Sequence, residues 1–87
     1  MKWIVRLSRQ AIKDAKKLAK AGYKAKAEKL LKVLEINPFM NPPPYKKLVG
    51  NLEGFYSRRI TIQYRLIYSI SEINKIVYVL IMWTHYE

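Results

Sequence analysis

Residues 55–83 read FYSRRITIQYRLIYSISEINKIVYVLIMW, and this stretch decides the fold class. It is rich in the β-branched and aromatic residues that favour strands, and short polar breaks divide it into segments. The pattern predicts strands over residues 55–61, 64–70 and 75–83, with turns near residues 62–63 and 71–74. Residues 76–82 are apolar at nearly every position, which is typical of a strand in the interior of a sheet.

The first half of the chain predicts a short strand and two helices. Loose alternation over residues 1–7 indicates the strand. Ser8 is typical of a helix N-cap and Gly22 of a helix stop. The helix between them has one apolar stripe at helical spacing, made of Ala11, Ile12, Ala15, Leu18 and Ala19. A second stripe predicts another helix that ends near residues 36–38, formed by Ala27, Leu30, Leu31 and Leu34.

A proline-rich connector joins the two halves. Residues 37–44 read NPFMNPPP, which cannot be helical and favours a stiff polyproline II segment. Residues 45–49 are a candidate short strand, followed by a turn near Gly50 and Asn51. We therefore predict one α+β domain over residues 1–87, in the order β-α-α-β-β-β. A helical hairpin should cover one face of a twisted, antiparallel-rich sheet, and the charge should lie on the other face.

The charge balance points to a polyanionic partner. The 87 residues include 17 Lys or Arg and 6 Asp or Glu, a net charge of +11, and such a surplus attracts nucleic acid or, as a second possibility, a membrane surface. No apolar run approaches the ~18 residues that span a bilayer, and the first run ends at Arg6, unlike a signal peptide. With no Cys and one His, we expect no disulfide, zinc site, other metal or cofactor, and a cytoplasmic protein.

Two groups of cations are candidates for RNA contacts. Lysines on the helix faces, including Lys16, Lys17 and Lys20, suit non-specific phosphate attraction or are simply a solvated face. Arg58 and Arg59 must point to opposite faces of their strand. If the next loop is centred on residue 62, Arg59 lies opposite Arg65, an unfavourable pair unless an anion sits between them. The alternative is that the arginines pair with Glu53 or the C-terminus.

The end of the chain holds the only His, in the sequence WTHYE over residues 83–87. Near the arginines, Tyr86 could stack on a base and His85 could move a proton during RNA cleavage. The alternative is a histidine without a chemical role.

Six segments together resemble a known family: NPF (37–39), PPPY (42–45), NLEG (51–54), YSRRI (56–60), YRLIY (64–68) and MWTHY (82–86). They are similar to the Txe/YoeB branch of the RelE toxin superfamily, closely over the last fifty residues or so and by pattern only over the helices. The resemblance implies a type II toxin that cuts mRNA on the ribosome and has a microbial-ribonuclease-like fold. The implied partners are an acidic antitoxin of the YefM/Phd type, the ribosome and mRNA, with a homodimer left open.

The resemblance also implies a mechanism without metal. A base takes the ribose 2′-OH proton, the oxygen attacks the adjacent phosphate, and an acid protonates the leaving 5′-oxygen, which gives a 2′,3′-cyclic phosphate. By resemblance, His85 is the acid, Arg65 clamps the phosphate with Arg59 in support, and Tyr86 positions base or backbone. Further RNA contacts are expected from Lys47, Arg58, Lys16, Lys17 and Lys20.

One position departs from the family pattern. Lys46 stands where the branch usually carries its general-base glutamate, and a protonated lysine accepts no proton. The chain is then an inactivated variant, a weak natural toxin, or an enzyme with a Lys/Arg cluster like that of RelE itself. Glu53 is a nearby acid, but we do not expect it to replace the missing general base. Tyr64 stands where the branch often has His. The alternative function is a non-catalytic module that binds the ribosome or an antitoxin.

Overall fold

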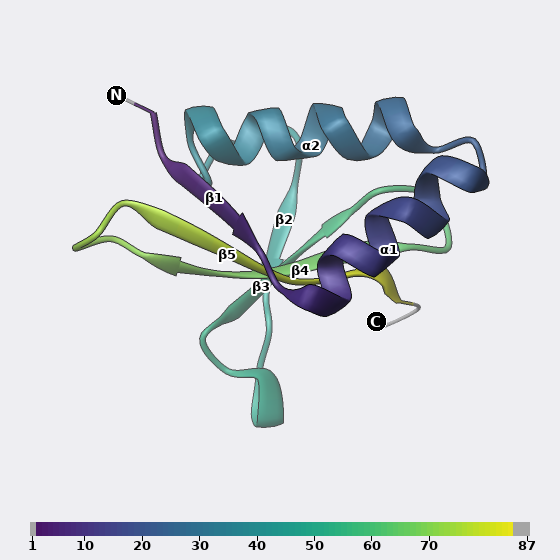
Figure 1. The fold of residues 1–87 in the computed structure, drawn as a ribbon. Coiled ribbons are helices and arrows are strands. Elements are labelled where there is room, and N and C mark those ends of the chain that lie inside the picture. Colours follow the sequence, from purple (N-terminus) through teal and green to yellow (C-terminus); the bar gives the residue numbers. More distant parts are fainter. Residues whose placement is uncertain (1, 85–87) are drawn as a thin grey trace.

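A five-stranded sheet with the strand order β1-β5-β4-β3-β2 forms the centre of the computed structural model, which describes residues 2–84 (Figure 1). The strands are β1 (Ile4–Leu7), β2 (Tyr45–Lys47), β3 (Phe55–Arg59), β4 (Arg65–Ser71) and β5 (Ile76–Thr84). β1 pairs with β5 in parallel, and the other neighbours are antiparallel. The predicted α+β class is confirmed, and the candidate strand after the connector forms as β2.

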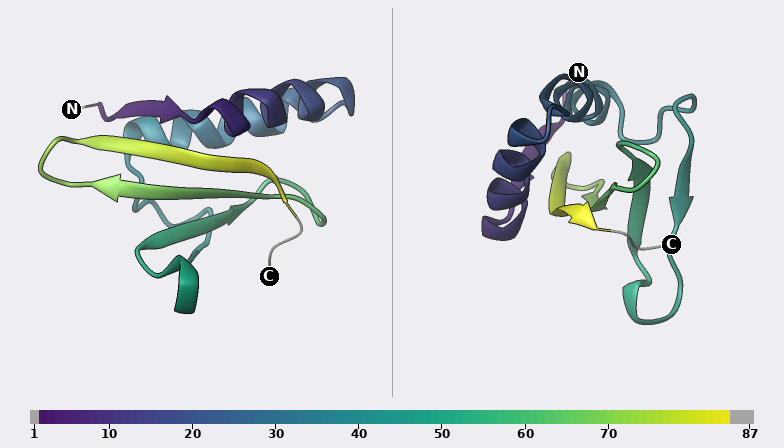
Figure 2. Two further views of the ribbon diagram at one scale, coloured as in Figure 1. Left: turned by 60° about the horizontal axis from the view of Figure 1, so that its bottom comes forward. Right: turned by 90° about the vertical axis from the view of Figure 1, so that its right-hand side faces the viewer.

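Two helices, α1 (Arg9–Lys20) and α2 (Lys24–Ile36), lie on one face of this sheet (Figure 2). The Ser8 hydroxyl caps α1 by accepting from the Ala11 N–H at 2.9 Å, as predicted. Gly22 follows α1 with φ of +88°, a conformation that glycine adopts without strain. The core between helices and sheet includes Leu18, Leu34, Leu66, Tyr68, Val77, Val79 and Met82. Neither helix is long and apolar enough to cross a membrane.

Polar side chains of α1 hold the second half of β5. β1 ends at Leu7, so the β5 backbone beyond this point has no neighbouring strand on that side. The Ser8 hydroxyl donates to the Leu80 carbonyl at 2.7 Å, and the Asp14 carboxylate accepts from the Met82 N–H at 3.0 Å. Asp14 is only 1% exposed, so α1 replaces the missing strand as a hydrogen-bond partner.

The loop between β3 and β4 differs from a simple hairpin turn. The predicted strand over residues 55–61 ends at Arg59, and residues 60–64 form the connection. The Thr61 hydroxyl accepts from the backbone N–H groups of Gln63 and Tyr64, each at 3.1 Å. A threonine side chain therefore closes a turn that contains none of the usual turn-forming residues.

Candidate functional site

The face of the sheet opposite the helices carries the arginine pair expected from the sequence. Arg59 on β3 lies directly opposite Arg65 on β4, whereas Arg58 pairs with Leu66 on the face toward the helices. The odd-length loop centred on residue 62 sets this register. The prediction that Arg59 shares a face with Arg65 is confirmed.

An open pocket of about 290 Å³ lies over this pair, lined by Pro44, Tyr45, Lys46, Ser57, Arg59 and Arg65. Lys46 on β2 pairs with Ser57 on β3, and paired residues of adjacent strands share a face. Arg65 donates from Nη1 to the Ser57 hydroxyl at 3.2 Å. Because Ser57 is only 1% exposed, its hydroxyl fixes the direction of the Arg65 guanidinium.

No carboxylate among residues 2–84 lines this pocket, although three of its side chains are cationic. Among residues 2–84, the one ion pair joins Lys2 and Glu35 at 4.0 Å. Glu53 therefore does not neutralise Arg59 or Arg65, so that half of the alternative interpretation is wrong. The other suggested partner, the C-terminus, lies outside the described residues. Opposed cations of this kind are stabilised by an anion between them, and guanidinium groups bind phosphate in a bidentate way.

Arg58 has a structural role, and the prediction that it contacts RNA is wrong. Its side chain is 0% exposed. It donates to the Tyr68 hydroxyl at 3.0 Å and to the carbonyls of Pro38 at 2.9 Å, Met40 at 2.8 Å and Pro43. The Tyr45 ring lies 4.9 Å from the guanidinium. These dipoles and the aromatic face stabilise a buried cation that has no carboxylate partner in the described chain.

Hydrogen bonds from Arg58 and contacts with aromatic rings thus fix the position of the proline-rich connector. Phe39 packs edge-on against Trp3 and Tyr56, with ring centroids 6.1 and 6.3 Å apart. Tyr56 also stacks on Tyr68 at 5.6 Å. Burial raises the pKa of Tyr68 to about 12, against the opposing effect of the nearby Arg58 guanidinium. This packing fixes the connector. Because the connector leads directly into β2, it also sets the position of Lys46 in the pocket.

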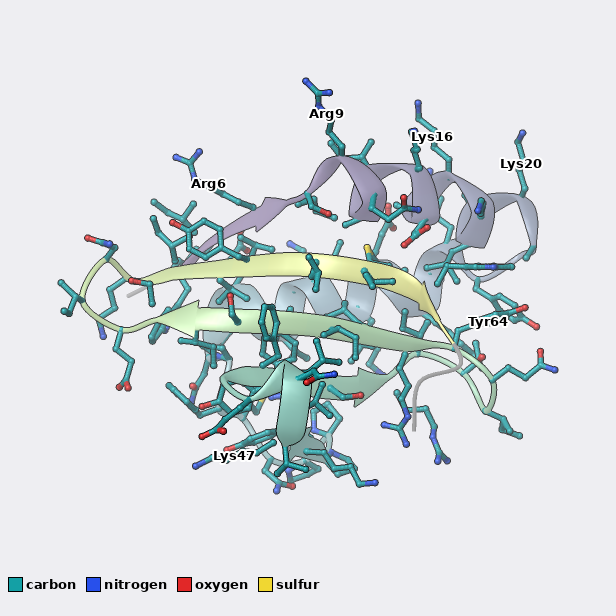
Figure 3. The ribbon with its side chains drawn as sticks, turned by 90° about the horizontal axis from the view of Figure 1, so that it is seen from below. Arg6, Arg9, Lys16, Lys20, Lys47 and Tyr64 are labelled. Carbon is teal, nitrogen blue, oxygen red and sulfur yellow. The ribbon has the colours of Figure 1, made fainter. Side chains whose placement is uncertain are left out.

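The remaining predicted lysines do not gather at the pocket. Figure 3 looks onto the open face and shows Lys16 and Lys20 projecting from α1 on one side, with Lys47 on the other. Lys17 is also exposed on α1, whose buried residues are Ala11, Asp14 and Leu18. Lys47 pairs with Tyr56 and so belongs to the face opposite that of Lys46. Contacts of these lysines with RNA stay predictions.

Two predicted catalytic residues, His85 and Tyr86, lie outside the described residues. β5 ends at Thr84, which is the backbone partner of Arg65. Ser57 was missed as a site residue, although it lies two positions before Arg59 and alternation places both on one face. Asp14 was missed as a buried polar residue, although it lies three positions after Ala11 and four before Leu18, on the buried side of α1.

Comparison with known proteins identifies relatives of this fold. The sequence model of the family described as "ParE toxin of type II toxin-antitoxin system, parDE" matches residues 5–85. A comparison with individually curated proteins gives no match.

Three solved structures illustrate the likeness. The YoeB/ParE toxin from Agrobacterium tumefaciens is 24% identical with a TM-score of 0.84, covering 95% of this chain and 99% of that one. The toxin in the heterotetrameric YoeB-YefM toxin-antitoxin complex from Staphylococcus aureus is 27% identical with a TM-score of 0.77, covering 99% and 100%. The YoeB dimer from Staphylococcus aureus is 27% identical with a TM-score of 0.79, again covering 99% and 100%.

Proposed function

Because the chain belongs to the ParE family of toxins from type II toxin–antitoxin systems, we propose that it is an endoribonuclease that cleaves mRNA on the ribosome. The observation that carries the proposal is the cationic pocket of Lys46, Arg59 and Arg65, which no carboxylate of the described residues lines. A pocket of this composition suits a phosphodiester whose negative charge increases in the transition state.

The reaction that fits is an intramolecular transesterification. The ribose 2′-oxygen loses its proton to water and forms a bond to the adjacent phosphorus, while the bond from phosphorus to the 5′-oxygen breaks. The products are a 2′,3′-cyclic phosphate and a 5′-hydroxyl that has gained a proton. In this scheme Arg65, oriented by Ser57, and Arg59 stabilise the phosphorane charge, His85 donates the proton, and Tyr86 positions the substrate.

Lys46 limits this chemistry. A protonated lysine offers three N–H donors and no acceptor, so it stabilises negative charge but takes no proton from the 2′-OH. We therefore propose an attenuated nuclease. The second candidate, a non-catalytic module that binds the ribosome or an antitoxin, is favoured by the same observation, because a cationic pocket without a base can bind phosphate without cleaving it.

The test is toeprinting of programmed ribosomes with the wild type, Arg65→Gln, His85→Gln and the exposed control Arg9→Gln at equal concentrations. We expect weak cleavage by the wild type and by the control. Loss of a transition-state donor in Arg65→Gln should lower the rate by about 10²–10³, and loss of the acid in His85→Gln by about 10²–10⁴. Ribosome binding by the wild type without cleavage at any concentration would support the binding module and overturn the nuclease.

We further propose an acidic antitoxin as the cognate partner. The net charge of +11 supports this, as does the presence of YefM with the toxin in the similar Staphylococcus aureus complex. Co-expression with the small acidic protein of a neighbouring reading frame should give a complex that elutes as one species. Sedimentation of the isolated chain will distinguish a monomer from a homodimer.

A further inference from the structure

A second polar row crosses the same open face of the sheet, away from the arginine pocket. Arg6 on β1 pairs with Tyr78 on β5, Tyr78 pairs with Ser69 on β4, and Ser69 pairs with Phe55 on β3. Residues paired in this way point to one face, so the four side chains form a continuous cross-strand row. The proposed catalytic scheme uses none of them.

This row lines a pocket of about 370 Å³ that is separate from the arginine pocket. Tyr78 is 44% exposed on the interior strand β5, so its ring is accessible from the open face. Arg6 is exposed beside it and, in the described chain, has no ion-pair partner. Figure 3 shows Arg6 reaching outward from the β1 edge of this face. Within the part of the chain that the structure describes, no carboxylate lines the pocket.

The two pockets are aligned along one strand. Phe55, Ser57 and Arg59 alternate onto the open face of β3, so the aromatic row and the arginine row are separated by four residues, or about 13 Å along the strand. Open sheet faces that carry aromatic residues can stack about two or three splayed RNA bases. An extended RNA strand can therefore contact both rows at once.

We propose that the row of Arg6, Tyr78, Ser69 and Phe55 is a second subsite for the same single-stranded RNA. Tyr78, with Phe55 beside it, stacks on an unpaired base, Ser69 hydrogen-bonds to its edge, and Arg6 binds a backbone phosphate. This inference rests on the proposed function, because it takes the arginine pocket as the place of the scissile phosphate. Stacking of this kind tolerates different bases because each presents a π-face.

The test measures binding of a fluorescent single-stranded oligouridylate and of an abasic strand of equal length and charge. Tyr78→Ala should weaken oligouridylate binding by about 5-fold or more, as expected for a lost base stack. It should leave binding of the abasic strand unchanged, and Tyr78→Phe should restore the affinity. Arg6→Gln should weaken the binding of both strands. It should also lower the salt dependence of binding by the equivalent of about one phosphate contact. The control Arg9→Gln should change the affinity for either strand less than Arg6→Gln does.

Several outcomes would overturn the subsite. If Tyr78→Ala lowered the affinity for oligouridylate and for the abasic strand equally, the ring would stack on no base. A Tyr78→Ala variant that loses affinity for polyglutamate and not for oligouridylate would assign the row to an acidic protein. Failure of the wild type to bind oligouridylate would also overturn it. In each case ribosome toeprinting still decides the proposed nuclease, so the two failures are distinguishable.

Discussion

At the scale of single residues, the nature of the pocket depends on Lys46. It faces Ser57 across the β2–β3 pair and lies in the same pocket as both arginines. Its charge therefore adds to theirs at the place where a cleaving enzyme of the proposed type needs a proton acceptor.

Lys46→Glu should increase ribosome-dependent cleavage by about 10²–10⁴, because it supplies a general base that the neighbouring arginines keep ionised. Toeprinting at matched concentrations measures the change. Lys47→Glu is the matched control, since it makes the same charge change on the opposite face of the strand and should not raise cleavage. Reduced cleavage in Lys46→Glu, from a clearly active parent, would instead favour a catalytic Lys/Arg cluster.

Tyr68 makes a pH-dependent contribution to stability. Its pKa is about 12 in the folded chain and about 10 in the unfolded chain. Above pH 10 the unfolded chain loses the phenol proton while the folded chain retains it. The stabilisation is complete below pH 10 and is lost as the pH rises toward 12. Urea unfolding should therefore show the free-energy gap between the wild type and Tyr68→Phe narrowing over this range. A constant gap would contradict this assignment.

The two adjacent arginines mark a limit of prediction from sequence. Alternation correctly places Arg58 and Arg59 on opposite faces, but it does not say which face is buried. Arginine is mostly exposed in proteins, so an exposed role was the natural expectation for both. The burial of Arg58 depends on carbonyl groups from a connector 15 to 20 residues away, and no local pattern reports that arrangement.

At the scale of elements, the attachment of α1 to β5 depends on hydrogen bonds as well as on apolar contacts. Asp14→Ala should lower the free energy of unfolding by roughly 1–3 kcal/mol, because the buried Met82 N–H loses its acceptor. Asp14→Asn keeps an acceptor oxygen and should cost less, and Glu28→Ala, at an exposed site on α2, should cost little. Urea unfolding measures all three. Similar stabilities for Asp14→Ala and Glu28→Ala would argue against this role.

The elements themselves were largely predictable, whereas their arrangement was not. Ser8, Gly22 and the apolar stripes located α1 and α2, and the apolar stretch 76–82 correctly predicted an interior strand. The parallel pairing of β1 with β5 joins segments about 70 residues apart, and nothing local specifies that partner. The early end of β3 depends on the Thr61 hydroxyl, which turn propensities do not capture.

At the scale of the whole molecule, positive charge is distributed over two surfaces. One is the open face with Lys46, Arg59 and Arg65, and the other is the outer side of the helices, where α1 carries Lys16, Lys17 and Lys20 and α2 carries Lys24, Lys26, Lys29 and Lys32. A large ribonucleoprotein can contact both surfaces, whereas a short RNA strand in the pocket contacts only the first.

Replacing Lys16, Lys17 and Lys20 together with Gln should weaken ribosome binding and lower its salt dependence. If each lysine neutralises a phosphate, the slope of log K against log salt should fall by about 2. Cleavage by the bound toxin should be unchanged, because these side chains lie away from the pocket. Binding measured at several salt concentrations tests the first expectation, and toeprinting at saturation tests the second. An unchanged slope would exclude α1 from the ribosome contact.

The hydrogen bonds from Arg58 to the connector also determine which sequence changes this segment can tolerate. Arg58 recognises the main-chain carbonyls of Pro38, Met40 and Pro43, and not their side chains. Side-chain replacements at an exposed position such as Asn41 leave those carbonyls in place. An inserted or deleted residue shifts the carbonyls out of register with the guanidinium and displaces Lys46. At constant length the connector should therefore accept varied side chains at exposed positions such as Asn41, but not at the buried Pro38 or at Phe39, which packs against Trp3 and Tyr56. Its exposed positions are suitable for randomisation, whereas the segment is a poor place to insert a tag.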